Sequence, residues 1–424
     1  MMIYPRQRRD FGIHHTNGEL FFIILYNRLS LDYPIIPIKF LLQSNKNKNV
    51  KRIVKYIAGI EKNLETACVF CIIINSKQFD MQFFNPTRFK LMEIMKMRRI
   101  NVGLLGMGNI GTGTYKTLEM NKGLITERTD ADIAITKILE IDVYRQRDVK
   151  VGLDQFTQNP DDILLDPDID IVIELLGGIE PATGFMIQAM ENGKHVVTAN
   201  KAALAADYDR FMAVAKENNV LFRFEASVGG GIPILTALSG ALQANEYMEI
   251  SGILNGTTNY ILTQMTENEM PYDSALKLAQ EKGFAEADPT ADVDGHDAAN
   301  KLSVLISLLF GKRVHPDDIP TIGIRDIGVQ DIKKAEDEKA KIKLIAQVKH
   351  SGDTLEYSVK PMFIPISHPL AGVNYEFNAI FVKGNAVDEL MFYGRGAGPL
   401  PTGSAVMGDV IEISKAIVKE AQRR

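Results

Sequence analysis

Cysteine, tryptophan and long apolar runs are all scarce in this sequence. Its 424 residues include two cysteines and no tryptophan. Two cysteines cannot form a disulfide framework, which favours a reducing compartment. No apolar run approaches the roughly 18 residues that a membrane-spanning helix needs, and one of the longest covers only residues 21–26. We therefore expect a cytoplasmic protein that has no membrane partner.

The rest of the composition is that of a folded globular protein. Apolar residues make up 46% of the chain and charged residues 24%. These values argue against wholesale disorder and collagen-like repeats. The length of the chain predicts two to three domains.

Basic charge gathers in the first hundred residues. Residues 1–99 hold 17 basic and 7 acidic residues, whereas the rest of the chain holds 31 basic and 46 acidic residues. Only three of the 33 glycines precede residue 100. We expect residues 1–97 to be a poorly ordered basic extension, or sequence upstream of the native start, because Met92, Met95 and Met97 directly precede the first strong strand.

Two features of this segment suggest partners, and neither is specific. Its positive charge is scattered, so we expect no nucleic-acid binding. Cys68 and Cys71 form a lone Cys-x-x-Cys motif without the second ligand pair that a zinc site needs. Two unpaired thiols are the simpler interpretation.

The pattern of apolar residues and glycines changes at residue 100. The apolar run 100–105 leads into Gly106-Met-Gly108-Asn-Ile-Gly111, and residues 112–118 follow with helical spacing. In this pattern the first glycine allows a tight turn, the second lets the backbone approach a pyrophosphate, and the third lets helix and strand pack closely. The helix N-terminus offers free N–H groups to the phosphates. The pattern predicts a dinucleotide-binding turn.

Strands and helices alternate after this turn. We expect strands at 133–139, 169–174 and 195–197 and a helix near 184–192. Such alternation is typical of an α/β fold with a doubly wound parallel sheet of Rossmann type. We place this dinucleotide-binding domain at residues 98–230.

The charges after the second strand leave the coenzyme undecided. An acid at this place binds the ribose hydroxyls of NAD, whereas a basic residue favours NADP. Glu140 and Asp142 compete there with Arg145 and Arg147. NAD and NADP therefore both stay open, as does a purely structural role for these charges.

Downstream residues suggest a substrate site. Lys201 follows a strand at the carboxyl end of the sheet, where such folds bind ligands. The segment 283–301 holds five acids within the twelve residues 286–297, interleaved with Gly, Pro and Ala. Asp297 and Lys301 lie four residues apart, at the start of a helix predicted to reach residue 310, so they share a face. An acidic pocket with lysines suits a zwitterionic amino acid.

The remaining signals are weaker. A glycine run at 225–233 precedes a helix expected at 234–242. It is either a plain connecting loop or a cation site made of oxygen ligands. A strand from residue 250 leads into a capped helix. Alternating charges at 333–343 are typical of an exposed helix. A Gly- and Pro-rich loop precedes a last helix expected at 404–420.

Taken together, five motifs resemble homoserine dehydrogenase, from about residue 100 to the C-terminus. Each motif alone is weak or moderate, but five in this order are specific. The segments that carry the resemblance are Gly103–Gly111, Thr198–Lys201, Gly252–Tyr260, Gly283–Lys301 and Gly394–Asp409.

The resemblance implies an oxidoreductase that acts on a CH–OH group. It would interconvert L-homoserine and L-aspartate 4-semialdehyde with NAD or NADP, in threonine and methionine biosynthesis. It also implies an α+β substrate-binding and dimerisation domain at 231–395, a C-terminal loop and helix at 396–424 that return to the nucleotide domain, and a homodimer.

The family motifs also imply roles for individual residues. Lys301 would exchange the proton with the substrate oxygen, Lys201 would assist, and burial and the charge of the neighbouring lysine would lower the pKa of the proton donor toward neutrality. Glu286, Asp292 and Asp297 would hold the substrate. A sodium-type cation would bind the Glu225 side chain and the carbonyls of Val228, Gly230 and Ile232. The coenzyme would contact Gly106, Gly108, Asn109, Ile110, Gly111, Thr198, Lys201, Gly283 and Gly403.

Two departures from the family pattern matter. Relatives often carry an arginine for the 2′-phosphate of NADP where this chain has Ile141. Many bacterial relatives also continue into a threonine-sensing domain, whereas this sequence stops at Arg424, so threonine inhibition by that route is not expected. Alternative interpretations are another amino-acid dehydrogenase and a nucleotide-binding regulator. Retention of both lysines disfavours the regulator.

Overall fold

A computed structural model describes residues 15–16, 19–24, 69–74, 79–84 and 97–423, in two units that divide after Met97. The described residues of the first unit form an antiparallel sheet of β1 (His15–Thr16), β2 (Glu19–Ile24), β3 (Val69–Ile74) and β4 (Phe79–Phe84). Sequence periodicity predicted none of these strands. Cys71 lies in β3, and Cys68 is outside the described residues. That residues 1–97 are an extension, or lie outside the native protein, stays a prediction.

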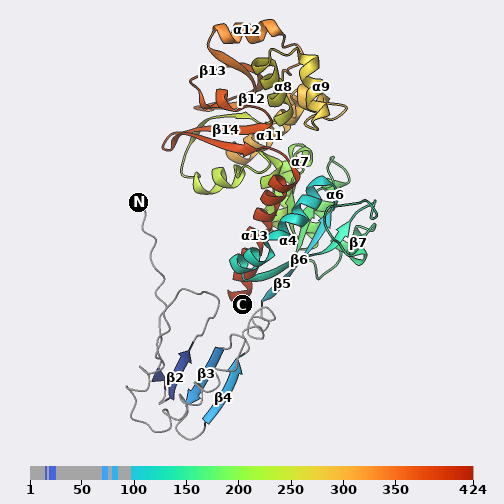
Figure 1. Cartoon of the computed structure of the whole chain (residues 1–424), viewed down its shortest axis with the longest axis vertical. Coiled ribbons are helices and arrows are strands. Elements are labelled where there is room, and N and C mark those ends of the chain that lie inside the picture. The colour runs from blue at the N-terminus through green and yellow to red at the C-terminus, as the bar shows by residue number, and fades with distance from the viewer. Residues whose placement is uncertain (1–14, 17–18, 25–68, 75–78, 85–96, 424) are drawn as a thin grey trace, which may run out of the picture. The chain divides into compact units, whose positions relative to one another are not determined.

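A parallel six-stranded sheet forms the core of the segment that begins at residue 98 (Figure 1). Its order is β10-β9-β8-β5-β6-β7, so the chain starts in the middle and winds outward in both directions. This order confirms the predicted Rossmann-type fold and places the ligand crevice between the first strand, β5, and β8. The strands are β5 (Arg98–Leu105), β6 (Ala131–Leu139), β7 (Phe156–Thr157), β8 (Ile171–Glu174), β9 (His195–Thr198) and β10 (Phe222–Arg223).

Helices cover this sheet, and every residue of β8 is buried, as expected for a parallel strand with both faces covered. The helix after the glycine turn is much longer than the predicted 112–118. No helix in the described ranges is long and apolar enough to cross a membrane. The helices are α4 (Asn109–Thr129), α5 (Asp161–Leu164), α6 (Ala182–Glu191), α7 (Lys201–Glu217) and α13 (Pro399–Arg423).

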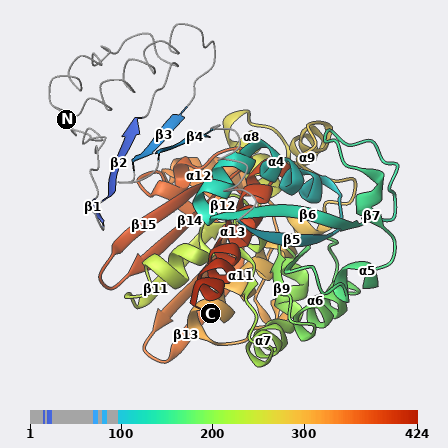
Figure 2. The ribbon, with the colours of Figure 1, turned by 90° about the horizontal axis from the view of Figure 1, so that it is seen from below.

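The C-terminal helix α13 packs along α4 (Figures 1 and 2). The contact is close because glycines face each other. A Cβ atom on Gly403 would lie 2.7 Å from the carbonyl carbon of Gly113, and one on Gly113 would lie 2.1 Å from the carbonyl oxygen of Pro399. Arg223, at the sheet edge, donates to Glu412 of α13 at 2.8 Å. The last helix therefore belongs to the core of the parallel-sheet region.

A second, antiparallel sheet has the order β13-β12-β11-β14-β15. The helix expected at 234–242 is present at residues 235–241, and its last five residues, Ala237–Ala241, form a π-helical turn. The other elements of this region are β11 (Tyr247–Ile253), α8 (Gly256–Glu267), α9 (Tyr272–Glu281), α10 (Thr290–Val293), α11 (His296–Phe310), α12 (Val329–Asp337), β12 (Ala340–Ser351), β13 (Thr354–Pro365), β14 (Phe377–Gly384) and β15 (Asp388–Arg395).

One predicted element is wrong. The exposed helix expected at 333–343 ends as α12 at Asp337, and the chain then continues as β12. Lys343 is almost wholly buried in that strand, with 2% of its surface exposed. Alternating charge misled the prediction because the buried lysine has its own polar partners, which lie far away in the sequence.

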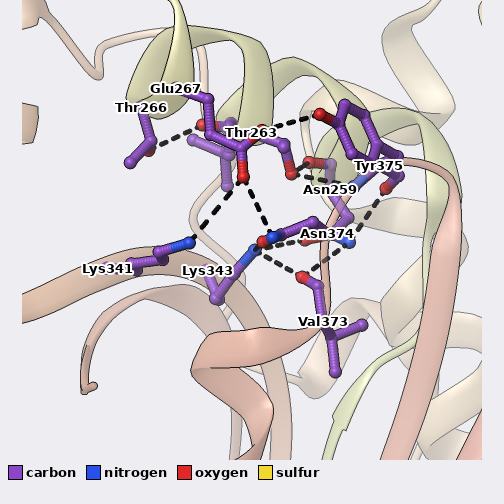
Figure 3. Close-up of polar contacts among 10 residues, drawn as sticks. Asn259, Thr263, Thr266, Glu267, Lys341, Lys343, Val373, Asn374 and Tyr375 are labelled. Carbon is purple, nitrogen blue, oxygen red and sulfur yellow. Dashed lines mark hydrogen bonds and ion pairs between the residues drawn. The ribbon is translucent and has the colours of Figure 1, made fainter.

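Those partners connect α8, β12 and the chain that leads into β14 (Figure 3). The Lys343 ammonium donates to Asn259 Oδ1 at 3.0 Å and to the carbonyl oxygen of Val373 at 2.5 Å. Asn259 in turn donates to the carbonyl oxygens of Val373, Tyr375 and Phe377. The network therefore fixes α8 against β12 and against the chain that leads into β14. Burial, with the charge of Lys341, lowers the pKa of Lys343 to about 7, and Glu267 opposes this effect.

The glycine contact between α13 and α4 predicts opposite effects for the same substitution at two places in one helix. Gly403→Ala should destabilise the protein by about 1–3 kcal/mol, because the new methyl group would press on backbone atoms that cannot move aside. Gly408→Ala is the matched control, since a Cβ there meets nothing within 4 Å. It should stabilise by up to about 1 kcal/mol. Equal free energies of unfolding for the two variants would contradict the close packing.

The buried Lys343 predicts a pH effect on stability. An unfolded lysine titrates near pH 10.4, so between pH 7 and 10 the unfolded chain binds more protons at this site than the folded chain. Stability should then rise with pH at up to about 1.4 kcal/mol per unit from this group. Lys343→Met should flatten the rise, measured as the free energy of unfolding at pH 7 and pH 9. Lys349→Met, on an exposed position of β12, should keep it.

Candidate active site

The glycine turn after β5 has the geometry that a dinucleotide requires. Gly106 has φ of +93°, which glycine adopts without strain, and its N–H donates to the carbonyl oxygen of Leu139 at 2.9 Å. A Cβ on Gly111 would lie 2.2 Å from the carbonyl oxygen of Gly106, whereas one on Gly108 would meet nothing within 4 Å. The third glycine thus permits close packing, and the second leaves open space where a pyrophosphate can approach. Asn109 and Ile110 start α4.

A buried acid lies at the end of β8, next to the end of β9. Glu174 is fully buried at the end of β8, where its carboxylate accepts hydrogen bonds from Thr198 Oγ1 at 2.6 Å and from the N–H groups of Leu176 and Gly177. Burial raises the pKa of Glu174, and these hydrogen bonds oppose that effect. The contacts tie the loop after β8 to the loop after β9.

The loop after β9 positions Lys201. Asn200 is the N-cap of α7 and accepts from the N–H of Ala203 at 3.1 Å. Its side-chain amide donates to the carbonyl oxygen of Gly178 at 2.6 Å. Both contacts fix the first turn of α7, so Lys201 leaves the sheet at its carboxyl edge in a defined direction.

Lys201 meets two residues that lie about a hundred positions further along the chain. Its Nζ is 3.2 Å from Oδ1 of Asp297, and Nζ of Lys301 is 2.6 Å from Oδ2 of the same carboxylate. Asp297 and Lys301 lie on consecutive turns of α11, which packs against α7. The structure thus brings Lys201 to the Asp297 and Lys301 pair that the sequence had placed on one helix face.

The charges of this cluster are strongly coupled. Burial acts to raise the pKa of the Asp297 carboxyl, but the charges of Lys301 and Lys201 outweigh it and hold that pKa below its usual range. The charge of Asp297 raises the pKa of Lys201, against the effect of burial. At Lys201 the nearby carboxylate therefore outweighs burial.

A side chain that the sequence analysis missed organises the acids. Asn255, the N-cap of α8, donates to Asp292 at 2.7 Å and to Asp297 at 2.9 Å. The carbonyl oxygen of the preceding residue, Leu254, accepts from Lys301 at 2.7 Å. The Asn-Gly-Thr-Thr sequence signals a helix cap, but only the fold shows that the same amide reaches two carboxylates.

The other predicted contacts lie around this centre. Glu286 is exposed, yet its charge contributes to the raised pKa of Lys201. Burial raises the pKa of Asp292. Gly283 follows α9 with φ of +75°. Gly403 is buried against α4, so helix packing alone accounts for a glycine there.

The predicted cation ligands lie in one loop, where Glu225 has partners of its own. Its carboxylate accepts from the N–H groups of Leu235 and Thr236 at 2.9 and 2.6 Å. Gly230 has φ of +56°, and the carbonyl oxygen of Ile232 accepts from the N–H of Ile234. Val228 follows the turn that Glu225 begins. The described residues contain no group of three His, Cys, Asp or Glu side chains placed to hold a metal ion. The cation stays a prediction.

Two family models match this chain, one over the parallel-sheet region and one over the region that follows it. The family model for the homoserine dehydrogenase NAD-binding domain matches residues 106–225, and the model for homoserine dehydrogenase matches residues 233–411. These ranges include the glycine turn, both lysines and the acidic cluster.

Individual relatives agree with the family models. The chain is 42% identical to the homoserine dehydrogenase of Bacillus subtilis over 319 residues, which are 75% of this chain and 74% of that protein. The crystal structure of a homoserine dehydrogenase from Thiobacillus denitrificans has a TM-score of 0.73 at 40% identity, covering 77% of this chain and 76% of the other. A hyperthermophilic archaeal homoserine dehydrogenase in complex with NADPH has a TM-score of 0.61 at 25% identity and covers 74% of this chain and 98% of the other. The chain belongs to the homoserine dehydrogenase family.

Proposed function

We propose that this chain interconverts L-homoserine and L-aspartate 4-semialdehyde with NAD or NADP, in threonine and methionine biosynthesis, and that Lys301 exchanges the proton. Membership of the family supports the reaction. The observation that carries the residue assignment is the cluster of Lys201, Asp297 and Lys301 at the carboxyl edge of the nucleotide-binding sheet.

The geometry of Lys301 suits a proton donor. An ammonium group has three donors, and two of them are used by Asp297 and by the carbonyl oxygen of Leu254. The third can reach a substrate oxygen. Lys301 is 9% exposed, so that bond forms in a site from which most water is excluded.

When the coenzyme is bound, its nicotinamide would supply or accept the hydride, and the residues of this chain would move the proton. In the reductive direction Lys301 would give its proton to the developing alkoxide, and in oxidation the neutral lysine would take the hydroxyl proton. Lys201, the second cation on Asp297, would polarise the same oxygen. Asp297 orients both amines.

The carboxylates of the site fit a zwitterionic substrate. Asp297 already pairs with two lysines, so we assign it chiefly to positioning them at the substrate. Glu286 and Asp292 would then receive the substrate ammonium, with Asp292 held in place by Asn255. Gly283 would contact the coenzyme beside this pocket.

The same proposal divides the chain into functional parts. Residues 98–230 would bind the coenzyme through Gly106–Gly111, Thr198 and Lys201, residues 231–395 would bind substrate and pair two subunits, and residues 396–424 would close the coenzyme site through Gly403. A homodimer would use the substrate domain's sheet, where Met391 and Tyr393 of β15 are exposed. A monovalent cation at Glu225 and a cytoplasmic location complete the proposal.

Replacing Lys301 tests the assignment. Lys301→Ala should lower kcat in both directions by about 10²–10⁴, the usual contribution of a general acid, and should leave NADH and NADPH affinity near the wild-type value. Lys301→Arg keeps the charge but cannot release a proton, so it should be almost as slow. The measurement is nicotinamide absorbance, with coenzyme fluorescence for binding.

Lys312→Ala, at an exposed lysine just beyond α11, is the matched control and should keep full activity. A Lys301→Ala variant that loses coenzyme binding and turnover equally would show that the residue supports the coenzyme site rather than the proton step.

A further inference from the structure

The acid at the end of β6 lies where the two coenzymes differ. Glu140 directly follows this second strand of the sheet, and its Oε2 accepts from the N–H of Met107, in the glycine turn, at 3.1 Å. In dinucleotide-binding sheets the adenosine ribose lies between these two segments. We propose that Glu140 makes this enzyme select NAD over NADP.

The long α4 explains why sequence spacing left Glu140 ambiguous. The acid lies further from Gly111 than the roughly 20 residues usual for this position. The helix runs for 21 residues and β6 for nine before Glu140. Its place at the strand end is therefore the usual one, reached by a longer helix.

The carboxylate is held in place, with capacity left for a ligand. Oε1 of Glu140 accepts from the N–H of Asp142 at 3.2 Å, and Oε2 also lies 3.1 Å from Arg147. A carboxylate has about four acceptor sites, and these contacts use three. One site stays available to a ribose hydroxyl, and the side chain is 16% exposed.

Arg147 is the nearest cation, and its position prevents it from serving a phosphate. Its guanidinium donates to the carbonyl oxygens of Met107, Asp142 and Arg145 at 2.9–3.0 Å. The side chain is 5% exposed and lies against the ring of Phe156. Arg147 therefore braces the loop after β6 and would have to abandon these contacts to reach a 2′-phosphate.

The other nearby side chains are less able to bind a 2′-phosphate than the sequence suggested. Ile141 is 86% exposed and has no donor in its side chain. Lys116 lines the adjoining cavity but is paired with Asp148. Arg145 also lines that cavity, and its guanidinium lies 3.4 Å from Asn109 Oδ1. Arg147 and Arg395 line the same cavity, but Arg147 is committed to the loop after β6, and Arg395 pairs with Glu376 at 2.9 Å. Arg145 is thus the strongest competing candidate, and it defines the alternative to be tested.

The charges give the direction of selectivity. A ribose hydroxyl can donate to Glu140, whereas a phosphate at that place would bring like charges together. Like-charge contact costs several kcal/mol, which is about a hundredfold or more in affinity. This proposal rests on the proposed function for the identity of the reaction, but coenzyme binding can be measured without substrate.

The test is the dissociation constant of the full chain for NADH and for NADPH, measured by coenzyme fluorescence, together with kcat/KM for NAD⁺ and NADP⁺ with L-homoserine. The wild type should favour the NAD forms about a hundredfold. Glu140→Gln should weaken NADH binding about tenfold by removing a charge-assisted hydrogen bond. It should also narrow the preference for NADH over NADPH.

Glu127→Gln makes the same chemical change at an exposed position near the far end of α4 and should alter nothing. Arg145→Ala tests the alternative. The proposal fails if the wild type binds NADPH as well as or better than NADH, and a selective loss of NADPH by Arg145→Ala would then assign the coenzyme choice to that arginine.

Failure of the proposed function would look different. The chain would bind NADH selectively, and lose that selectivity in Glu140→Gln, but homoserine would produce no reduced coenzyme from NAD⁺ or NADP⁺. Selective binding would then still support Glu140 as the determinant, while the substrate assignment would fall.

Discussion

The ion cluster on Asp297 is the interaction on which the candidate active site depends. One carboxylate accepts Lys201 from the first turn of α7 and Lys301 from α11. Helix α7 follows a strand of the parallel sheet, and α11 contacts β12 of the antiparallel sheet. The cluster therefore connects the two sheet regions. The buried Lys301 and the partly exposed Lys201 would repel each other without a carboxylate between them. Asp297 without them would be an unpaired buried charge.

Polar networks around this cluster give it rigidity. Asn255 ties Asp297 to Asp292, and Glu174 ties the loops after β8 and β9. Further away, Asn259 and Lys343 fix the helix that begins at Asn255 against β12. Each network uses buried groups with several partners, which hold side chains more narrowly than apolar contacts do. The ammonium of Lys301 is therefore held among several polar networks that fix the elements around it.

Much of this architecture could be predicted from the sequence, because local chemistry determines it. The glycine turn, the alternation of strands and helices and the spacing of Asp297 and Lys301 are all local patterns. Lys343 and Asn255 could not be found in this way. Their meaning depends on partners that are 30 to 84 residues away, and alternating charge alone wrongly predicted an exposed helix through Lys343. The resemblance to a family supplied the reaction, which the residue patterns alone left open.

The charged residues after β6 are a second place where the sequence alone could not predict the function. Counting acids and bases after this strand gives two of each, and the count cannot decide the coenzyme. The structure separates them by what each already binds. Arg147 is buried and donates hydrogen bonds to three carbonyl oxygens. Glu140 keeps one free acceptor site and is partly exposed. Charge that is committed within the fold is lost to a ligand, so selectivity depends on unused hydrogen-bonding capacity and not on the number of charged residues.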